Sequence, residues 1–199
     1  MAIIVEHEKR RIKILKKALT VFVDDGFENA TFQKIADRCG ITRTILYLYF
    51  KNKREIFRYS IKQLLTSSEE NMNSINADKT LNTVEKINKI FLSIFSQLEE
   101  NRQLVSVIMN YLMHVARREI EPEKRVRRRT IKLRILLTSL MIEGIKKGEF
   151  RKFNVKVAGN YLYSFIDAAI CQLVVLKRKN LDELRETVTF AIKQLTVNT

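Results

Sequence analysis

The chain has 199 residues, of which 46% are hydrophobic, so it is long enough to fold around a substantial core. Its 37 Lys and Arg against 22 Asp and Glu give a net charge of +15, which favours nucleic acid or another polyanion as a partner. Five Gly and one Pro are few for this length, and alternating apolar and polar runs are rare, so we expect an all-α fold.

Neither a membrane span nor a reactive site is indicated. The longest apolar stretches fall well short of the roughly 20 residues that cross a bilayer, and the N-terminus lacks the order of a signal peptide, so we expect a cytoplasmic protein without membrane association. Cys39 and Cys171 lie far apart, outside any CxxC pair, and are interpreted as small core residues. His7 and His114 lie on separate segments, and GxSxG, HExxH and P-loop patterns are absent. The sequence therefore predicts no catalytic residue, no metal and no cofactor.

The N-terminal segment is expected to be a basic arm followed by a helix. The arm, residues 1–11, either adds charge near DNA phosphates or stays solvated. Apolar residues then recur at helical spacing from Ile12 to Val23, and the helix is expected to end near Gly26.

Residues 31–53, TFQKIADRCGITRTILYLYFKNK, contain two short predicted helices. Thr31 can cap the first, Gly40 can adopt the positive φ that its exit requires, and Thr42 can cap the second. A short turn, apolar residues where the helices cross and polar groups on the outer face are what a DNA-reading helix-turn-helix needs. The segment therefore predicts DNA binding.

A fourth helix is expected to begin at Asn52, with Glu55 in a capping-box position, and to fade in the polar run 66–79, which we interpret as a hinge or loop between two domains. Pro122 suits the first turn of a later helix, and Gly148 suits a stop. The remaining helices are expected at about 80–100, 102–119, 122–147, 154–178 and 181–196.

The last two of these helices are unusually apolar, between Val155 and Val174 and between Leu181 and Leu195. They offer more apolar surface than one side of a small domain needs. We therefore predict a homodimer through the last two helices, which would form a four-helix interface. The alternative is that these residues are buried within one chain.

A set of spaced residues between Ile14 and Phe57 resembles the TetR (tetracycline repressor) family of bacterial regulators. The matching residues are Phe22, Gly26, Phe27, Thr31, Ile35, Ala36, Gly40, Ile41, Thr42, Leu46, Tyr47, Tyr49, Phe50, Asn52 and Lys53. The stretch EGIKKGEFR at 143–151 is also similar to one found before the penultimate helix in many members.

The resemblance implies an N-terminal three-helix helix-turn-helix DNA-binding domain, residues 1–52, followed by a larger helical ligand-binding and dimerisation domain, residues 53–199, with about nine helices in all. It also implies a dimeric repressor that binds a pseudo-palindromic double-stranded DNA operator and is released by a small-molecule effector. The competing interpretation is a ligand-independent architectural or interaction protein built on the same fold.

Eight residues are expected at the DNA: Thr31, Gln33, Thr42, Arg43, Thr44, Tyr47, Tyr49 and Lys53. Arg43, at the exposed start of the second short helix, can donate two hydrogen bonds to guanine O6 and N7, and Thr44 can contact a base edge or a thymine methyl. Thr31 can meet phosphate through its helix N-terminus.

Other DNA contacts follow from the resemblance alone. It implies that Gln33 reaches a base, as in some members, and that Tyr47, Tyr49 and Lys53 lie against the DNA backbone, with Tyr47 also reaching bases in some members. The alternatives are a solvated Gln33 and tyrosines partly packed in the core. Phe32 stands where some members have a second threonine near phosphate, so we do not expect that contact here.

The candidate ligand-binding residues of the larger domain are Asn110, Tyr111, His114, Tyr161, Phe165 and Asp167. They are polar or aromatic groups set among apolar ones, and core or interface packing is the alternative for each. The run 124–134 contains seven basic residues in eleven. It is interpreted as a solvated face, with an anionic ligand, added DNA attraction or an acidic partner as the functional alternatives.

Overall fold

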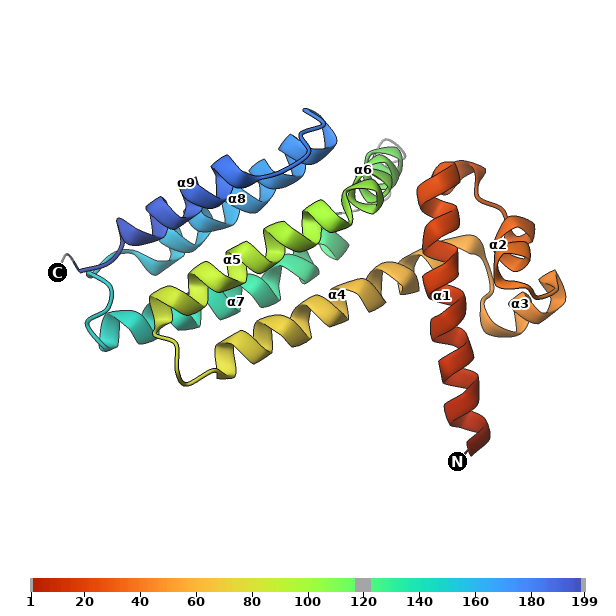
Figure 1. The fold of residues 1–199 in the computed structure, drawn as a ribbon, viewed down its shortest axis with the longest axis horizontal. Helices are drawn as coiled ribbons and strands as arrows, with labels where there is room; N and C mark the ends of the chain where they lie inside the picture. Colours follow the sequence, from red (N-terminus) through yellow and green to blue (C-terminus); the bar gives the residue numbers. More distant parts are fainter. Residues whose placement is uncertain (1, 117–122, 198–199) are drawn as a thin grey trace. The chain divides into compact units, whose positions relative to one another are not determined.

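The computed structural model describes residues 2–116 and 123–197, without the side chains of 2–5, 64, 67, 115, 116 and 123–130. Within these ranges it contains nine helices and no strand, so the predicted all-α class is confirmed (Figure 1). The helices are α1 (Ala2–Asn29), α2 (Phe32–Cys39), α3 (Arg43–Tyr49), α4 (Lys53–Ala77), α5 (Thr83–Glu100), α6 (Arg102–Ala116), α7 (Glu123–Lys146), α8 (Val155–Val174) and α9 (Asp182–Lys193).

The chain divides into two compact units, residues 1–69 and 70–199, and the division falls within α4. The boundary at residue 52 implied by the family resemblance differs from this division and stays a prediction. None of the described helices is long and apolar enough to cross a membrane.

The unit of residues 1–69 is built around one apolar core shared by α1 to α4. Its fully buried side chains include Phe22, Ile35, Leu46, Phe50, Ile56 and Phe57. The rings of Phe22 and Phe57 meet edge to face with centroids 4.9 Å apart. The buried hydroxyl of Ser60 donates to the carbonyl of Leu15 at 3.0 Å, so the polar group on this face of α4 is satisfied.

Gly26 interrupts α1 where the sequence predicts a stop. Its φ of 74° and ψ of 168° are not helical, yet the chain resumes a short helical turn that ends at Asn29. The break lets Ala30 donate its N–H to the carbonyl of Gly26 at 3.2 Å and enter the core before α2 begins. The expected end of the regular helix is therefore correct, although three helical residues follow it.

The loop expected at 66–79 is wrong, because α4 continues through this polar run to Ala77, but the boundary between the two compact units does fall within the run, between Glu69 and Glu70. Met72 and Ile75 pack against the core of the second unit. Lys86, itself 8% exposed, donates to the carbonyl of Asn76 at 2.8 Å and so satisfies a backbone group in the last turn of α4. Tertiary contacts therefore maintain a helix that the local polarity does not favour.

The second unit packs α5 against α7, α8 and α9, which run alongside it in Figure 1. Its core includes Ile87, Phe91, Phe95, Leu137, Leu162 and Val188. Asn82 and Glu85 form a capping box at the start of α5, three residues after the predicted start. Gly148 has a φ of 74° just after α7, as expected of a helix stop, whereas Pro122 lies outside the described residues.

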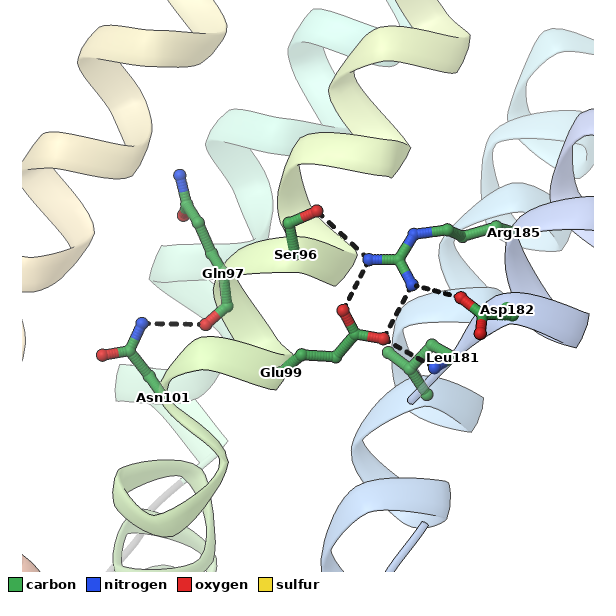
Figure 2. Close-up of polar contacts among 7 residues, drawn as sticks. All are labelled: Ser96, Gln97, Glu99, Asn101, Leu181, Asp182 and Arg185. Atoms are coloured by element: carbon green, nitrogen blue, oxygen red, sulfur yellow. Dashed lines mark hydrogen bonds and ion pairs between the residues drawn. The ribbon is translucent and has the colours of Figure 1, made fainter. Parts of the chain in front are cut away.

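A polar network joins α5 to the start of α9 within this unit (Figure 2). The carboxylate of Glu99 accepts two hydrogen bonds from the guanidinium of Arg185, at 2.7 and 2.6 Å, and a third from the backbone N–H of Leu181 at 2.6 Å. Arg185 also donates to Ser96 Oγ at 3.1 Å. Both charged side chains are about four-fifths buried, with 22% and 19% exposed, so the network replaces the water that each group loses.

The two cysteines differ from the prediction that both are core residues. Cys171 is exposed on α8, and Cys39 is half-buried at the end of α2. Burial raises the pKa of the Cys39 thiol, and the positive charge of Lys17 opposes that shift only in part. Cys171 lies outside the core because the buried face of α8 is formed by neighbouring residues such as Ala169 and Leu173.

Candidate nucleic-acid interface

The helix-turn-helix has the caps and the turn that the sequence predicts. Thr31 Oγ1 accepts from the N–H of Lys34 at 3.2 Å, and Thr42 Oγ1 accepts from the N–H of Ile45 at 3.3 Å. Gly40 has a φ of 69°, and its N–H donates to the carbonyls that end α2. These local contacts define where α2 and α3 begin and where α2 ends, while burial of Ile35 and Leu46 in the shared core holds the two short helices in place.

The outer face of α3 is open to solvent. Leu46 is fully buried and anchors the helix, while Arg43 and Thr44 are exposed at its N-terminal end. Tyr47 is 48% exposed, and Leu48 is 74% exposed. An anchored helix with a polar, exposed N-terminal turn is the arrangement that enters a DNA major groove.

Arg43 is held by a neighbour on the same helix. Its Nη2 donates to Tyr47 Oη at 3.1 Å, and its guanidinium lies 5.5 Å from the centre of the Tyr47 ring. Phe32 on α2 stacks on the ring of Tyr47, with ring centroids 4.5 Å apart and an angle of 27° between the ring planes. The three side chains therefore form a continuous stack from the core to the exposed face of α3.

The remaining predicted DNA residues are also placed by the structure. Thr31, Gln33 and Thr42 are exposed, and the amide of Gln33 donates to Asp37 Oδ1 at 2.7 Å. Tyr49 is half-buried and stacks on His7, with ring centroids 4.4 Å apart. This stack joins α1 to α3 between residues far apart in the sequence, and no local signal predicts it.

The predicted N-terminal arm is wrong for residues 2–11, which form the first turns of α1. Arg11 packs its guanidinium 4.4 Å from the ring centre of Tyr59, and this contact ties the start of α1 to α4. A groove of about 430 Å³ between α1 and the α2–α3 turn is lined in part by Lys9, Lys13 and Lys17. The basic residues are therefore presented from a helix rather than from a free segment.

Lys53 binds backbone carbonyl groups of its own chain. Its ammonium group donates to the carbonyls of Phe27, Glu28 and Ala30, at 2.9, 2.7 and 3.1 Å. Three hydrogen bonds use all three N–H groups of the lysine. The phosphate contact expected of Lys53 stays a prediction, and forming it would require exchanging at least one of these carbonyls for a phosphate oxygen.

Replacing Lys53 with methionine is expected to destabilise the chain by about 1–2 kcal/mol, because the carbonyls at the end of α1 lose a charged donor that methionine cannot replace. Lys51→Met is the matched control, since Lys51 is exposed and its side chain has no contact of this kind in the described structure. Denaturant unfolding of both variants measures the difference. Equal stability of the two variants would show that the carbonyl contacts contribute nothing.

The six ligand candidates do not share one environment. Asn110, Tyr161 and Asp167 are exposed, and Tyr111, His114 and Phe165 are half-buried. The rings of Tyr161 and Phe165 lie 5.4 Å apart on α8, and Phe165 packs against the core. The other three, Asn110, Tyr111 and His114, lie on α6, which contacts α8. Their role as ligand contacts stays a prediction.

The helix-turn-helix lies within a segment that matches a known protein family. Residues 14–59 match the family described as "Bacterial regulatory proteins, tetR family". The uncharacterized HTH-type transcriptional regulator YfiR of Bacillus subtilis (strain 168) is 30% identical over 155 residues, which cover 73% of this chain and 71% of that protein. The chain belongs to the TetR family of transcriptional regulators. It is therefore a DNA-binding regulator, and its family is not one of enzymes.

Two further comparisons extend along most of this TetR-family chain. The fatty acid metabolism regulator protein of Bacillus subtilis (strain 168) is 24% identical over 173 residues, which cover 84% of this chain and 85% of that protein. A TetR transcription regulator from Haloarcula marismortui ATCC 43049 has a similar fold, with a TM-score of 0.83 and 19% identity over 96% of this chain and 100% of that chain. The similarity of fold therefore includes both compact units.

Proposed function

We propose that this TetR-family chain is a dimeric repressor that binds a pseudo-palindromic operator through α3 and is released by a small-molecule effector. The observation that carries the proposal is α3 itself, anchored by the buried Leu46 and presenting Arg43, Thr44 and Tyr47 to solvent. Two such helices related by a two-fold axis would read two half-sites about one helical turn of DNA apart.

Within each half-site, Arg43 and Thr44 are proposed to read bases, because they lie at the exposed N-terminal turn of α3. Thr31, Thr42 and Tyr49 are proposed to lie near the DNA backbone and fix the register of the helix. The amide of Gln33 donates one hydrogen to Asp37, and its second N–H and its carbonyl oxygen are the groups proposed to reach a base. The lysines along the groove of α1 add positive charge beside this surface, which supports a strong dependence of binding on salt concentration.

Arg43→Ala is expected to relax the base preference of the protein at one position of each half-site, because the bidentate contact to guanine is lost. The expected loss of discrimination is about 5- to 100-fold at that position. The preferred sequence can be obtained by selecting bound DNA from a random pool with wild-type and variant protein. An unchanged preference, or equal weakening on selected and random DNA, would contradict a base contact by Arg43.

The proposed dimer uses the surface of α8 and α9 that stays exposed within one chain. Many of the apolar residues in these helices, including Leu162, Ile166 and Val188, are buried in the core of their own unit, as the alternative interpretation expects. A second stripe remains on the outer face of α8, at helical spacing. Its members are Val157, Tyr161, Ser164, Ala168, Cys171 and Val175, of which Ala168 is half-buried and the others are exposed, and α9 contributes the exposed Phe190.

Val157→Glu is expected to convert the dimer to a monomer, because two buried carboxylates would then face an apolar interface. Val157 is 63% exposed in one chain, and Ile135 on α7 is 62% exposed, so Ile135→Glu is a control of matched exposure outside the stripe. Sedimentation equilibrium measures both variants. A monomeric wild type, or dissociation by both substitutions alike, would contradict the assignment of this stripe.

For the effector, the relative that regulates fatty acid metabolism makes acyl compounds the first class to test. A ligand releases the operator only if it binds the non-binding conformation more tightly than the DNA-binding one. Titrating acyl compounds into a complex of the protein with its selected DNA tests this part of the proposal. Release by no compound, together with many dispersed DNA sites, would instead favour the architectural alternative.

A further inference from the structure

The stack of Phe32, Tyr47 and Arg43 connects the buried side of the helix-turn-helix to its exposed DNA-reading surface. Phe32 is 9% exposed and belongs to α2, whereas Tyr47 and Arg43 lie one turn apart on α3. The stack therefore combines one fixed ring, one half-exposed ring and one exposed charged group. Each member contacts the next, at 4.5 Å between the two rings and 3.1 Å between Tyr47 Oη and Arg43 Nη2.

An arginine at the surface ordinarily samples many rotamers, and ordering it on a base costs conformational entropy. Here the hydroxyl and the ring of Tyr47 both hold the guanidinium before DNA is present. The tyrosine has few rotatable bonds, so ordering it costs less than ordering arginine alone. Tyr47 is thus able to fix the direction in which Arg43 presents its hydrogen-bond donors.

The bond to Tyr47 leaves the recognition edge of the guanidinium intact. Nη2 carries two hydrogens, one on each of the two edges of the planar fork that can form paired hydrogen bonds. Donating one hydrogen to Tyr47 Oη uses one edge and leaves the other complete. A complete edge is what a bidentate contact to guanine O6 and N7 requires. The Arg43 side chain can therefore bond to Tyr47 and make a bidentate contact to guanine at the same time.

Phe32 gives the stack its fixed end. Its ring is buried on α2, close to the fully buried Ile35 and Ala36 of the same helix. Stacking at 4.5 Å with nearly parallel planes restricts the ring of Tyr47, of which almost half is exposed. The position at which some family members have a threonine near phosphate is used here to support an aromatic ring.

We propose that Tyr47 is a positioning residue that sets base specificity through Arg43, and that Phe32 supports it from α2. This inference rests on the proposed base contact by Arg43. It assigns the operator preference of this chain to a three-residue stack rather than to the arginine alone. In this account the hydroxyl of Tyr47 matters for one base pair, not for affinity to DNA in general.

The test is a double-substitution cycle in the full chain, with DNA selected from a random pool by the wild type and then varied one base pair at a time. Tyr47→Phe keeps the ring and removes the hydroxyl, so discrimination is expected to fall about 3- to 10-fold at the position that Arg43→Ala relaxes. In the Arg43→Ala background the same change is expected to have no effect at that position. Phe32→Leu, which keeps an apolar core residue, is expected to act in the same direction after thermal unfolding confirms that it folds.

Tyr59→Phe is the matched control, because Tyr59 lies on α4, outside the proposed DNA contacts, and its ring packs against the guanidinium of Arg11 instead of Arg43. It is expected to leave the relaxed position unchanged. Suppose that Arg43→Ala relaxes one position, but Tyr47→Phe weakens binding to all sequences alike or has the same effect in the Arg43→Ala background. The base contact by Arg43 would then stand, but the stack would not set specificity. If Arg43→Ala relaxes no position, the proposed base contact fails first, and this inference fails with it.

Discussion

Replacing Arg185 with methionine is expected to destabilise the chain by about 2–4 kcal/mol. The substitution leaves the carboxylate of Glu99 about four-fifths buried with a single remaining donor, the N–H of Leu181 (Figure 2). Removing one partner of a buried ion pair costs several kcal/mol because the other charge stays desolvated, and the partial exposure of both groups reduces that cost. The network joins α5 to α9, so its loss also loosens the helix proposed for the dimer interface.

The control for this prediction is Arg178→Met, in the loop before α9. Arg178 pairs with Glu183 at 2.7 Å, but the two side chains are 46% and 79% exposed. Such a surface pair is expected to contribute less than about 1 kcal/mol. Denaturant unfolding compares the two variants, and an equally small effect for Arg185→Met would show that the buried network is not a stabilising feature.

From the same network we also predict how the stability of the fold depends on pH in the acidic range. The hydrogen bonds from Arg185 are the main cause that lowers the pKa of the Glu99 carboxyl, and the N–H of Leu181 adds to them while burial opposes them. A carboxyl whose pKa is lower in the folded than in the unfolded chain stabilises the fold above its unfolded pKa. That stabilisation is lost as the pH falls through the folded pKa. Arg185→Met is therefore expected to flatten the dependence of unfolding on pH in the acidic range.

Gly144→Ala is expected to destabilise the chain by about 1–3 kcal/mol, whereas Gly159→Ala is expected to stabilise it by about 0.5–1 kcal/mol. A Cβ at Gly144 would overlap the ring of Phe150 and the hydroxyl of Thr83, and both side chains are at most 2% exposed. Thr83 cannot move freely, because its N–H donates to the carboxylate of Glu149 at 2.7 Å.

Gly159 provides the opposite case in a similar setting. It is also a buried helical glycine, but its added Cβ would meet nothing closer than Thr138 Oγ1 at 3.9 Å, an ordinary contact. Alanine there gains helix propensity without a clash. Thermal unfolding of both variants measures the contrast, and a change of the same sign in both would contradict this account of their surroundings.

The parts of the fold that sequence predicts well depend on neighbouring residues. Thr31 and Thr42 cap α2 and α3 through N–H groups three positions away, and Gly40 ends α2 by its own backbone conformation. These signals are complete within a few residues. The helix-turn-helix, the most local motif of the chain, is accordingly the part predicted in most detail.

The parts that sequence missed depend on distant residues. The run 66–79 is polar by itself and becomes helical because Met72 and Ile75 find partners in another part of the fold. In the sequence, Lys53 is a charged residue just after a helix rich in aromatic residues. Its carbonyl partners lie 23 to 26 positions earlier, so the sequence around Lys53 does not indicate them. The contact between His7 and Tyr49 likewise has no local signature.

The central claim is that two copies of α3, led by Arg43, read an inverted repeat in DNA. The most direct test selects the preferred sequence from a random pool with the purified chain and then measures the mass of the complex on that sequence. The account predicts an inverted repeat bound by two copies, with Arg43→Ala relaxing the equivalent position in both halves. A selection that enriches no sequence, or an asymmetric site bound by a single copy, would contradict it.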